Sequence, residues 1–285
     1  MTATAPSPLP PGRLVELGTR GRTFVREAGA HHGGPTLLLL HGWTATADLN
    51  FSTVYEPLAR HHHVIALDHH GHGRGVRNPA RFRLETCADD AARLCRELGL
   101  DRVIPVGYSM GGLVAQLVWR RHRDLVTGLV LCATSRNFAG NRRAQLMFGG
   151  VNGLSTALRA TPPSVRRSLT DRFRSSRVDT YELPWEQVEV SRHDPAALIE
   201  AAAAIGRFTS HDWIGDVDVP TAVVVNTADT TVPTHRQHKL AASIPDARTF
   251  TVDGDHRVIG NDPKQYAPVL SAACRHVTDA ARAPG

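Results

Sequence analysis

The sequence contains few cysteines, and they form none of the patterns found in cysteine-rich proteins. No Cys-x-x-Cys pair occurs, and the spacings suggest neither a disulfide framework nor a zinc site. Buried, reduced thiols are therefore expected, and we expect neither a metal nor another cofactor. The cysteines are Cys87, Cys95, Cys132 and Cys274.

Lysine is also scarce, since it occurs only at Lys239 and Lys264 and nearly all of the positive charge is carried by arginine. The net charge is +6, but the basic residues are scattered as singles and pairs without interleaved aromatic residues. Nucleic-acid-binding segments concentrate their basic residues instead. We therefore expect no nucleic-acid partner.

Long apolar runs are absent too. No stretch approaches the roughly 18 apolar residues of a membrane span. The N-terminus has neither the basic nor the apolar region of a signal peptide. We therefore expect no membrane span, a cytoplasmic location, and a disordered leader over residues 1–12. The oligomeric state is not indicated.

Short apolar segments and helical patterns alternate along most of the 285 residues. Residues 13–17 and 23–27 are predicted to form an antiparallel hairpin that turns at 18–21. Wholly apolar segments indicate strands covered on both faces, as in parallel sheets. They lie at residues 36–40, 64–67, 103–106, 129–132, 221–225 and 249–252. We predict an α/β fold with a mostly parallel eight-stranded sheet and helices on both faces.

The helical pattern is clearest in two connecting segments. One helix is predicted over residues 87–98, with Thr86 as its N-cap and Gly99 at its end. Another is predicted from the N-cap Asp194 through Ile205 to a stop at Gly206. Residues 135–210 carry no strand pattern, so we expect them to form an all-helical cap between the core segments 13–134 and 211–285.

Residues 107–111 read Gly-Tyr-Ser-Met-Gly and fit the Gly-x-Ser-x-Gly pattern of a nucleophile elbow. A predicted strand precedes this motif and an apolar helix follows it. The sharp turn exposes the Ser109 hydroxyl above the sheet edge, while Gly107 and Gly111 leave room for the crowded backbone. The start of the helix directs free N–H groups toward a developing oxyanion.

Polar residues follow most of the predicted parallel strands. In an open parallel sheet, ligands bind outside the carboxyl ends of the strands. These side chains are therefore expected to gather near Ser109 at one edge of the sheet. They include His41, Asp68, Asn226, Asp229, Asp253, Asp255 and His256.

Together, these motifs resemble those of the α/β-hydrolase superfamily over about residues 13–282. The order serine, aspartate, histidine is the one that this superfamily uses. The motifs are Leu-Leu-Leu-Leu-His-Gly-Trp at 37–43, Leu-Asp-His-His-Gly-His-Gly-Arg-Gly at 67–75, Gly-Tyr-Ser-Met-Gly-Gly at 107–112, Asp-Thr-Thr-Val-Pro at 229–233 and Gly-Asp-His at 254–256.

The resemblance implies a catalytic triad. Ser109 would be the nucleophile, His256 the general base, and Asp229 the acid that orients the imidazole. The backbone N–H groups of Trp43 and Met110 would form the oxyanion hole. Two other carboxylates, Asp253 and Asp255, could compete with Asp229 as the acid. Some superfamily members place the acid one strand earlier, but residues 133–138 contain no carboxylate.

The remaining candidate residues concern the pocket and a possible metal. We expect an apolar substrate pocket to involve His41, Tyr108, Phe138, Met147 and Trp185. The histidines at 61–63 and 69–72, with Asp68, could suggest a metal site. A structural role in the loop is favoured, because the segment from Asp68 matches the loop that follows this strand in the superfamily and no second ligand set is evident.

The serine in the elbow distinguishes this chain from dehalogenases and epoxide hydrolases, which use aspartate there. The leading hypothesis is hydrolysis of a small to medium apolar ester, lactone or thioester through an acyl-enzyme. Enol-lactonases, C–C bond hydrolases and haloperoxidase-like perhydrolases remain as alternatives. A menaquinone-pathway lyase is disfavoured, because Leu113 stands where that enzyme commonly has arginine. The alternative from another class is a non-enzymatic ligand receptor.

Overall fold

The computed structural model of the chain describes residues 8–29, 34–138 and 184–282. Its centre is one eight-stranded sheet with the strand order β1-β2-β4-β3-β5-β6-β7-β8. In chain order the strands are β1 Gly12–Glu16, β2 Arg22–Ala28, β3 Thr36–Leu40, β4 Val64–Leu67, β5 Val103–Tyr108, β6 Leu129–Cys132, β7 Thr221–Asn226 and β8 Arg248–Val252.

The pairs β1–β2 and β2–β4 are antiparallel. All other neighbouring strands of the sheet, from β4 through β3 to β8, pair in parallel. Every residue of the strands β3 to β7 is buried, which explains their predominantly apolar sequences. Strand β8 lies at one edge and has exposed residues. The predicted hairpin is confirmed, and a 3₁₀ turn at Gly18–Arg20 connects its strands.

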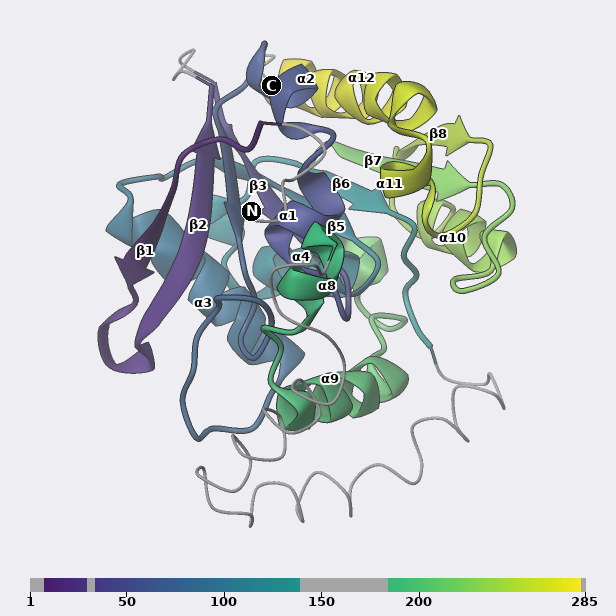
Figure 1. The fold of residues 1–285 in the computed structure, drawn as a ribbon. Coiled ribbons are helices and arrows are strands. Elements are labelled where there is room, and N and C mark those ends of the chain that lie inside the picture. The colour runs from purple at the N-terminus through teal and green to yellow at the C-terminus, as the bar shows by residue number, and fades with distance from the viewer. Residues whose placement is uncertain (1–7, 30–33, 139–183, 283–285) are drawn as a thin grey trace.

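Helices cover both faces of the sheet (Figure 1). Residues of α3, α4, α9 and α10 belong to the core on one face, and residues of α1, α2, α11 and α12 belong to the core on the other. The predicted α/β architecture is thereby confirmed. The helices are α1 Ala47–Phe51, α2 Tyr55–Ala59, α3 Leu84–Glu97, α4 Met110–Arg121, α8 Trp185–Val190, α9 Pro195–Arg207, α10 Thr234–Ala241, α11 Val258–Asn261 and α12 Pro263–Arg282. Within the described ranges, none of them is long and apolar enough to cross a bilayer.

Two helix ends differ from the predictions. Helix α3 begins at Leu84 rather than after Thr86, and its N-cap Arg83 makes no side-chain cap bond. The earlier start lets Leu84 join the buried apolar face, which outweighs the missing cap. Helix α9 does not stop at Gly206 but continues to Arg207.

The N-cap of α9 is confirmed. The Asp194 carboxylate accepts hydrogen bonds from the backbone N–H groups of Ala196 and Ala197. Most of the expected cap lies outside the described residues. Within residues 135–210, the described part contains α8, α9 and one isolated bridge between Asn137 and Thr209. The domain boundaries at 135 and 210 therefore remain a prediction.

Candidate active site

Ser109 lies at the sharp turn between β5 and α4. Its backbone angles are φ 55° and ψ −116°, which a residue with a side chain rarely adopts. Hydrogen bonds to residues beyond the turn hold the strained peptide. The Ser109 N–H donates to the Cys132 carbonyl at 2.9 Å, and its carbonyl accepts from Thr134 Oγ1 at 2.8 Å. The turn is thus fixed from the neighbouring strand β6 and the loop after it.

The glycines of the motif allow the backbone segments to approach closely. A Cβ atom on Gly107 would overlap the Gly111 carbonyl, and a Cβ on Gly111 would overlap the Leu40 carbonyl. Neither clash involves the flexible end of a side chain, so the backbone itself would have to move. The spacing Gly-x-Ser-x-Gly is therefore a packing requirement of this turn.

A chain of hydrogen bonds joins Ser109, His256 and Asp229. His256 Nε2 lies 2.9 Å from Ser109 Oγ, and His256 Nδ1 lies 2.7 Å from Asp229 Oδ2. With the Nδ1 proton donated to the carboxylate, Nε2 has a free lone pair and accepts from the serine hydroxyl. This arrangement can take a proton from Ser109 when its oxygen attacks a carbon.

The Asp229 carboxylate is buried and fully hydrogen-bonded. Oδ1 accepts from the backbone N–H groups of Thr231 and Val232, each at 2.9 Å. Oδ2 accepts from Gln237 Nε2 at 3.1 Å in addition to His256. All four partners face the carboxylate as donors, so both of its oxygens serve as acceptors. The sequence did not single out Gln237, because its α10 position has no motif.

The loop that carries His256 is held through Tyr108. The Tyr108 hydroxyl donates to the His256 carbonyl at 2.8 Å and accepts from Asn226 Nδ2 at 3.2 Å. The same amide nitrogen donates to the Asp255 carbonyl at 3.0 Å. Burial raises the pKa of Tyr108, so its hydroxyl stays protonated and continues to donate.

The loop after β3 lies directly against the serine. A Cβ on Gly42 would come within 3.3 Å of Ser109 Cβ, and the Gly42 N–H donates to Asn50 Oδ1 at 2.6 Å. Trp43 follows in this loop, and Met110 begins α4, where the first N–H groups have no partner within the helix. Both predicted oxyanion donors therefore belong to segments that flank Ser109.

A cavity of about 560 Å³ opens at Ser109 and His256. Its walls come from the loop after β3, from α1, from α8 and from the segment that follows His256. The charged lining residues are Glu186 and Arg257. The others include Trp43, Leu49, Tyr108, Trp185, Val190 and Ile259. The volume suits a small to medium organic substrate.

The sequence and the fold are similar to those of known proteins. A family profile described as alpha/beta hydrolase fold matches residues 35–263. The chain belongs to this family. Membership of this family makes the protein a hydrolase. This chain is 31% identical over 259 residues to the pimeloyl-[acyl-carrier protein] methyl ester esterase of Aromatoleum aromaticum. The match covers 85% of this chain and 98% of that esterase.

Solved structures show the same fold. A thermophilic esterase from Thermogutta terrifontis has a TM-score of 0.72 and 24% identity, covering 94% of this chain and 99% of that one. The enol-lactonase from Burkholderia xenovorans LB400 has a TM-score of 0.70 and 19% identity, covering 92% and 100%. At these identities the likeness concerns the fold of the α/β hydrolase.

The predicted pocket residues of the α/β hydrolase are only partly brought together. Tyr108 and Trp185 line the cavity. His41 does not, because it is fully buried behind the wall, where its Nε2 accepts from the His69 N–H at 2.9 Å. Phe138 packs against the core on the α4 side and is not a lining residue either. Met147 lies outside the described residues.

The other candidate acids make local contacts instead. Asp253 Oδ1 accepts from Thr227 Oγ1 at 2.9 Å, and Asp255 Oδ1 accepts from the Arg257 N–H at 2.8 Å. Neither carboxylate is hydrogen-bonded to His256. Of the three aspartates considered from the sequence, only Asp229 contacts the imidazole in the structure.

The histidine-rich loop packs as a buried cluster. His41 and His69 have ring centroids 4.4 Å apart, and His72 and His193 have centroids 5.3 Å apart. Burial lowers the pKa of His41 to about 3 and that of His193 to about 4, so these rings are neutral near pH 7. Among the described residues, no three His, Cys, Asp or Glu side chains are grouped to hold a metal.

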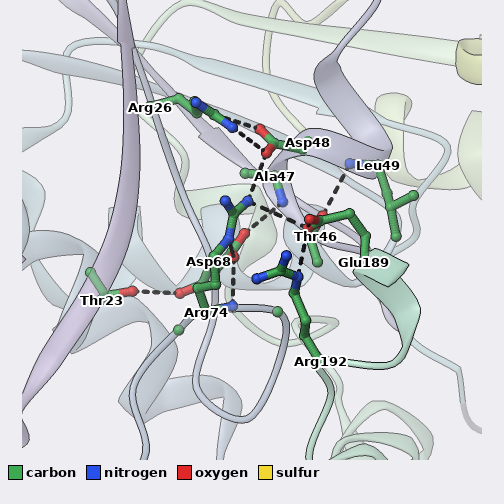
Figure 2. A network of polar contacts seen from close by, with 12 residues as sticks. Thr23, Arg26, Thr46, Ala47, Asp48, Leu49, Asp68, Arg74, Glu189 and Arg192 are labelled. Atoms are coloured by element: carbon green, nitrogen blue, oxygen red, sulfur yellow. Dashed lines mark hydrogen bonds and ion pairs between the residues drawn. The ribbon is translucent and has the colours of Figure 1, made fainter. Parts of the chain in front are cut away.

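An ionic network, which the sequence did not predict, joins α8 to the loops after β3 and β4 (Figure 2). Asp68 accepts from the backbone N–H groups of Ala47 and Arg74, each at 2.8 Å. The Arg74 guanidinium contacts Asp48 at 2.7 Å and Glu189 of α8 at 3.4 Å. Burial raises the pKa of Asp68 to about 6. The network positions α8, and with it Trp185, over the cavity.

Proposed function

We propose that this α/β hydrolase cleaves a small to medium carboxylic ester, lactone or thioester through an acyl-enzyme formed on Ser109. The observation that carries the proposal is the hydrogen-bond chain from Asp229 through His256 to Ser109 at the edge of the cavity. A serine hydroxyl is a poor nucleophile unless a base removes its proton during the attack. The relay supplies that base.

In the first half of the proposed reaction, Ser109 Oγ bonds to the substrate carbonyl carbon while its proton passes to His256 Nε2. The carbonyl oxygen becomes an oxyanion and accepts hydrogen bonds from the N–H groups of Trp43 and Met110. When the intermediate collapses, the bond to the leaving group breaks. His256 then returns the proton to the departing oxygen or sulfur.

In the second half, water enters and is deprotonated by His256. The hydroxide oxygen bonds to the acyl carbon, and the Ser109 ester bond breaks through a second oxyanion. The proton on His256 returns to Ser109 Oγ, and the carboxylic acid leaves. Asp229 stabilises the imidazolium in both halves and fixes the tautomer without taking the proton.

The relatives support ester hydrolysis as the leading chemistry. The Aromatoleum aromaticum relative is named a methyl ester esterase, and the Thermogutta terrifontis structure is an esterase. The enol-lactonase structure keeps lactones within the proposal. Lactones and esters both react at an acyl carbon and pass through intermediates of the same kind, so a single relay serves both.

The test is hydrolysis of 4-nitrophenyl butyrate by the wild-type protein and by Ser109→Ala, followed by an ester and lactone panel of graded acyl length. We expect kcat/KM to fall by at least about 10³-fold in the variant. Ser52→Ala is the matched control, because Ser52 lines the same cavity without a bond to His256. A fluorophosphonate should label Ser109. Equal rates for Ser109→Ala and wild type, or labelling elsewhere, would refute the proposal.

A further inference from the structure

A second hollow of about 470 Å³ lies between α2 and α12. We call it the basic groove, because its lining includes Arg60, His61, Lys264 and Arg275 but no carboxylate among the described residues. Figure 1 shows the two helices next to each other on the face of the sheet that also carries α1 and α11. The basic groove is therefore separate from the helices α8 and α9.

Most of the charge in the basic groove is uncompensated. Arg60 forms an ion pair with Glu56 at 2.6 Å, and both side chains are exposed. His61, Lys264 and Arg275 form no ion pair with any residue of the described ranges. Positive charges gathered in a concave surface with no counter-charge favour an anionic ligand.

Ser271 adds an independent sign of a ligand. This residue lines the basic groove and is only 7% exposed, yet its hydroxyl has no hydrogen-bond partner among the described residues. Serine side chains inside helices usually bond to a carbonyl of the preceding turn. A buried hydroxyl without a partner costs free energy, and rotation of the Ser271 side chain toward the basic groove would let the hydroxyl donate a hydrogen bond to a ligand there.

The basic groove adjoins the cavity at Ser109. Thr53, between α1 and α2, lines both hollows. The cavity continues past Ile259 and Asn261 of α11, and the basic groove begins at Pro263 of α12. Consecutive helices thus form each wall: α1 and α2 on one side, α11 and α12 on the other. Thr53 Oγ1 donates to the Ile259 carbonyl at 3.0 Å, so an extended substrate has to pass over this contact to reach from one hollow to the other.

We infer that the basic groove binds the far end of an extended substrate whose reacting carbonyl lies at Ser109. This inference rests on the proposed function and names its substrate class: esters or thioesters that carry a distal phosphate or carboxylate. Lys264 and Arg275 pair with the anion, and the Ser271 hydroxyl donates to it after its side chain rotates toward the basic groove. The anion is bound equally before and during the reaction, so it lowers KM and leaves kcat unchanged.

The experiment compares matched substrates that differ only in the distal anion. One pair is butyryl-4′-phosphopantetheine and butyryl-pantetheine, with phosphate on the leaving group. The other is the 4-nitrophenyl ester of suberic acid with a free or a methylated distal carboxyl group. In wild type, we expect that in at least one of the two pairs the anionic substrate has a KM about tenfold lower than its neutral counterpart. Added salt should reduce this preference.

The double variant Lys264→Gln/Arg275→Gln should abolish the preference while 4-nitrophenyl butyrate is hydrolysed as in wild type. The control variant Arg13→Gln/Arg22→Gln removes the same amount of charge from exposed arginines of the β1–β2 hairpin. This variant should retain the preference for the anionic substrate. The inference is wrong if neither pair shows a preference, or if the preference survives in the double variant. Hydrolysis of 4-nitrophenyl butyrate that persists in either case leaves the proposed function intact.

Discussion

The indole Nε1 of Trp43 donates a hydrogen bond to the Leu198 carbonyl at 2.9 Å, across 155 positions of the sequence. Trp43 follows the strand β3 beside Ser109, whereas Leu198 lies in α9. The bond ties the loop that carries a proposed oxyanion donor to a helix on the other side of the undescribed segment. The orientation of the Trp43 peptide therefore depends on where α9 lies.

Replacing Trp43 with phenylalanine tests this dependence. Trp43→Phe removes one neutral hydrogen bond, worth about 1 kcal/mol, and frees the loop to move. We expect kcat for 4-nitrophenyl butyrate to fall about fivefold. Trp119→Phe is the matched control, because it removes the indole bond to Asp218 in a part of the fold away from the cavity. An equal loss of kcat in both variants would contradict the prediction.

Asp229→Asn tests the acid of the relay. The amide has the same shape but lacks the charge, and its NH₂ group favours the wrong imidazole tautomer. We expect kcat to fall about 10²–10⁴-fold with the fold retained, as measured by steady-state kinetics and circular dichroism. Asp253→Asn is the control at a carboxylate that contacts Thr227 instead. A comparable loss in Asp253→Asn, or none in Asp229→Asn, would refute the assignment.

Gly111→Ala tests the packing requirement of the elbow. The added methyl group would overlap the Leu40 carbonyl, so β3 and α4 must separate. We expect the free energy of unfolding to fall by more than about 3 kcal/mol in urea denaturation, or folded protein to be lost. A Cβ on Gly260 would meet no atom within 4 Å, so Gly260→Ala should change the stability little. Equal stabilities of the two variants would show that the elbow tolerates a side chain.

His193 makes the stability depend on pH. Its Nδ1 accepts from the Gly73 N–H at 2.9 Å, and its Nε2 donates to the Thr44 carbonyl at 3.1 Å, so the ring must stay neutral. Burial lowers its pKa from 6.5 to about 4. The unfolded chain therefore takes up the proton first as the pH falls. The stability from this group is complete above pH 6.5 and is lost as the pH falls toward 4.

The variant His193→Gln measures this contribution. Glutamine retains one acceptor and one donor but does not titrate. Between pH 4.5 and 6, we expect the free energy of unfolding to fall by about 1.4 kcal/mol less per pH unit than in wild type. Urea denaturation at several pH values gives this slope. Replacing the exposed His238 with glutamine should leave the pH slope of the free energy of unfolding as it is in wild type. If His193→Gln keeps the wild-type slope, the buried ring does not cause the acid sensitivity.

The strands and the elbow were predictable from local patterns, whereas the contact between His256 and Asp229 was implied only by the resemblance to the superfamily. A run such as Leu-Leu-Leu-Leu at 37–40 indicates a strand that is buried on both faces, as it is in β3. The start of α3 was less predictable, because burial of Leu84 outweighed the capping preference at Thr86. His41 was misplaced because a residue after a strand can turn either into the cavity or behind its wall.

By itself, the sequence determined the order of the elements and the glycines that the elbow needs, because these depend on neighbours in the chain, whereas the residues of the relay came from the resemblance to the superfamily. Only the tertiary structure decided which groups meet across long separations. Gln237 supports Asp229, Glu189 contacts Arg74, and Thr53 borders both the cavity and the basic groove. Such contacts depend on how helices pack against the sheet, and that packing leaves no periodic pattern in the chain.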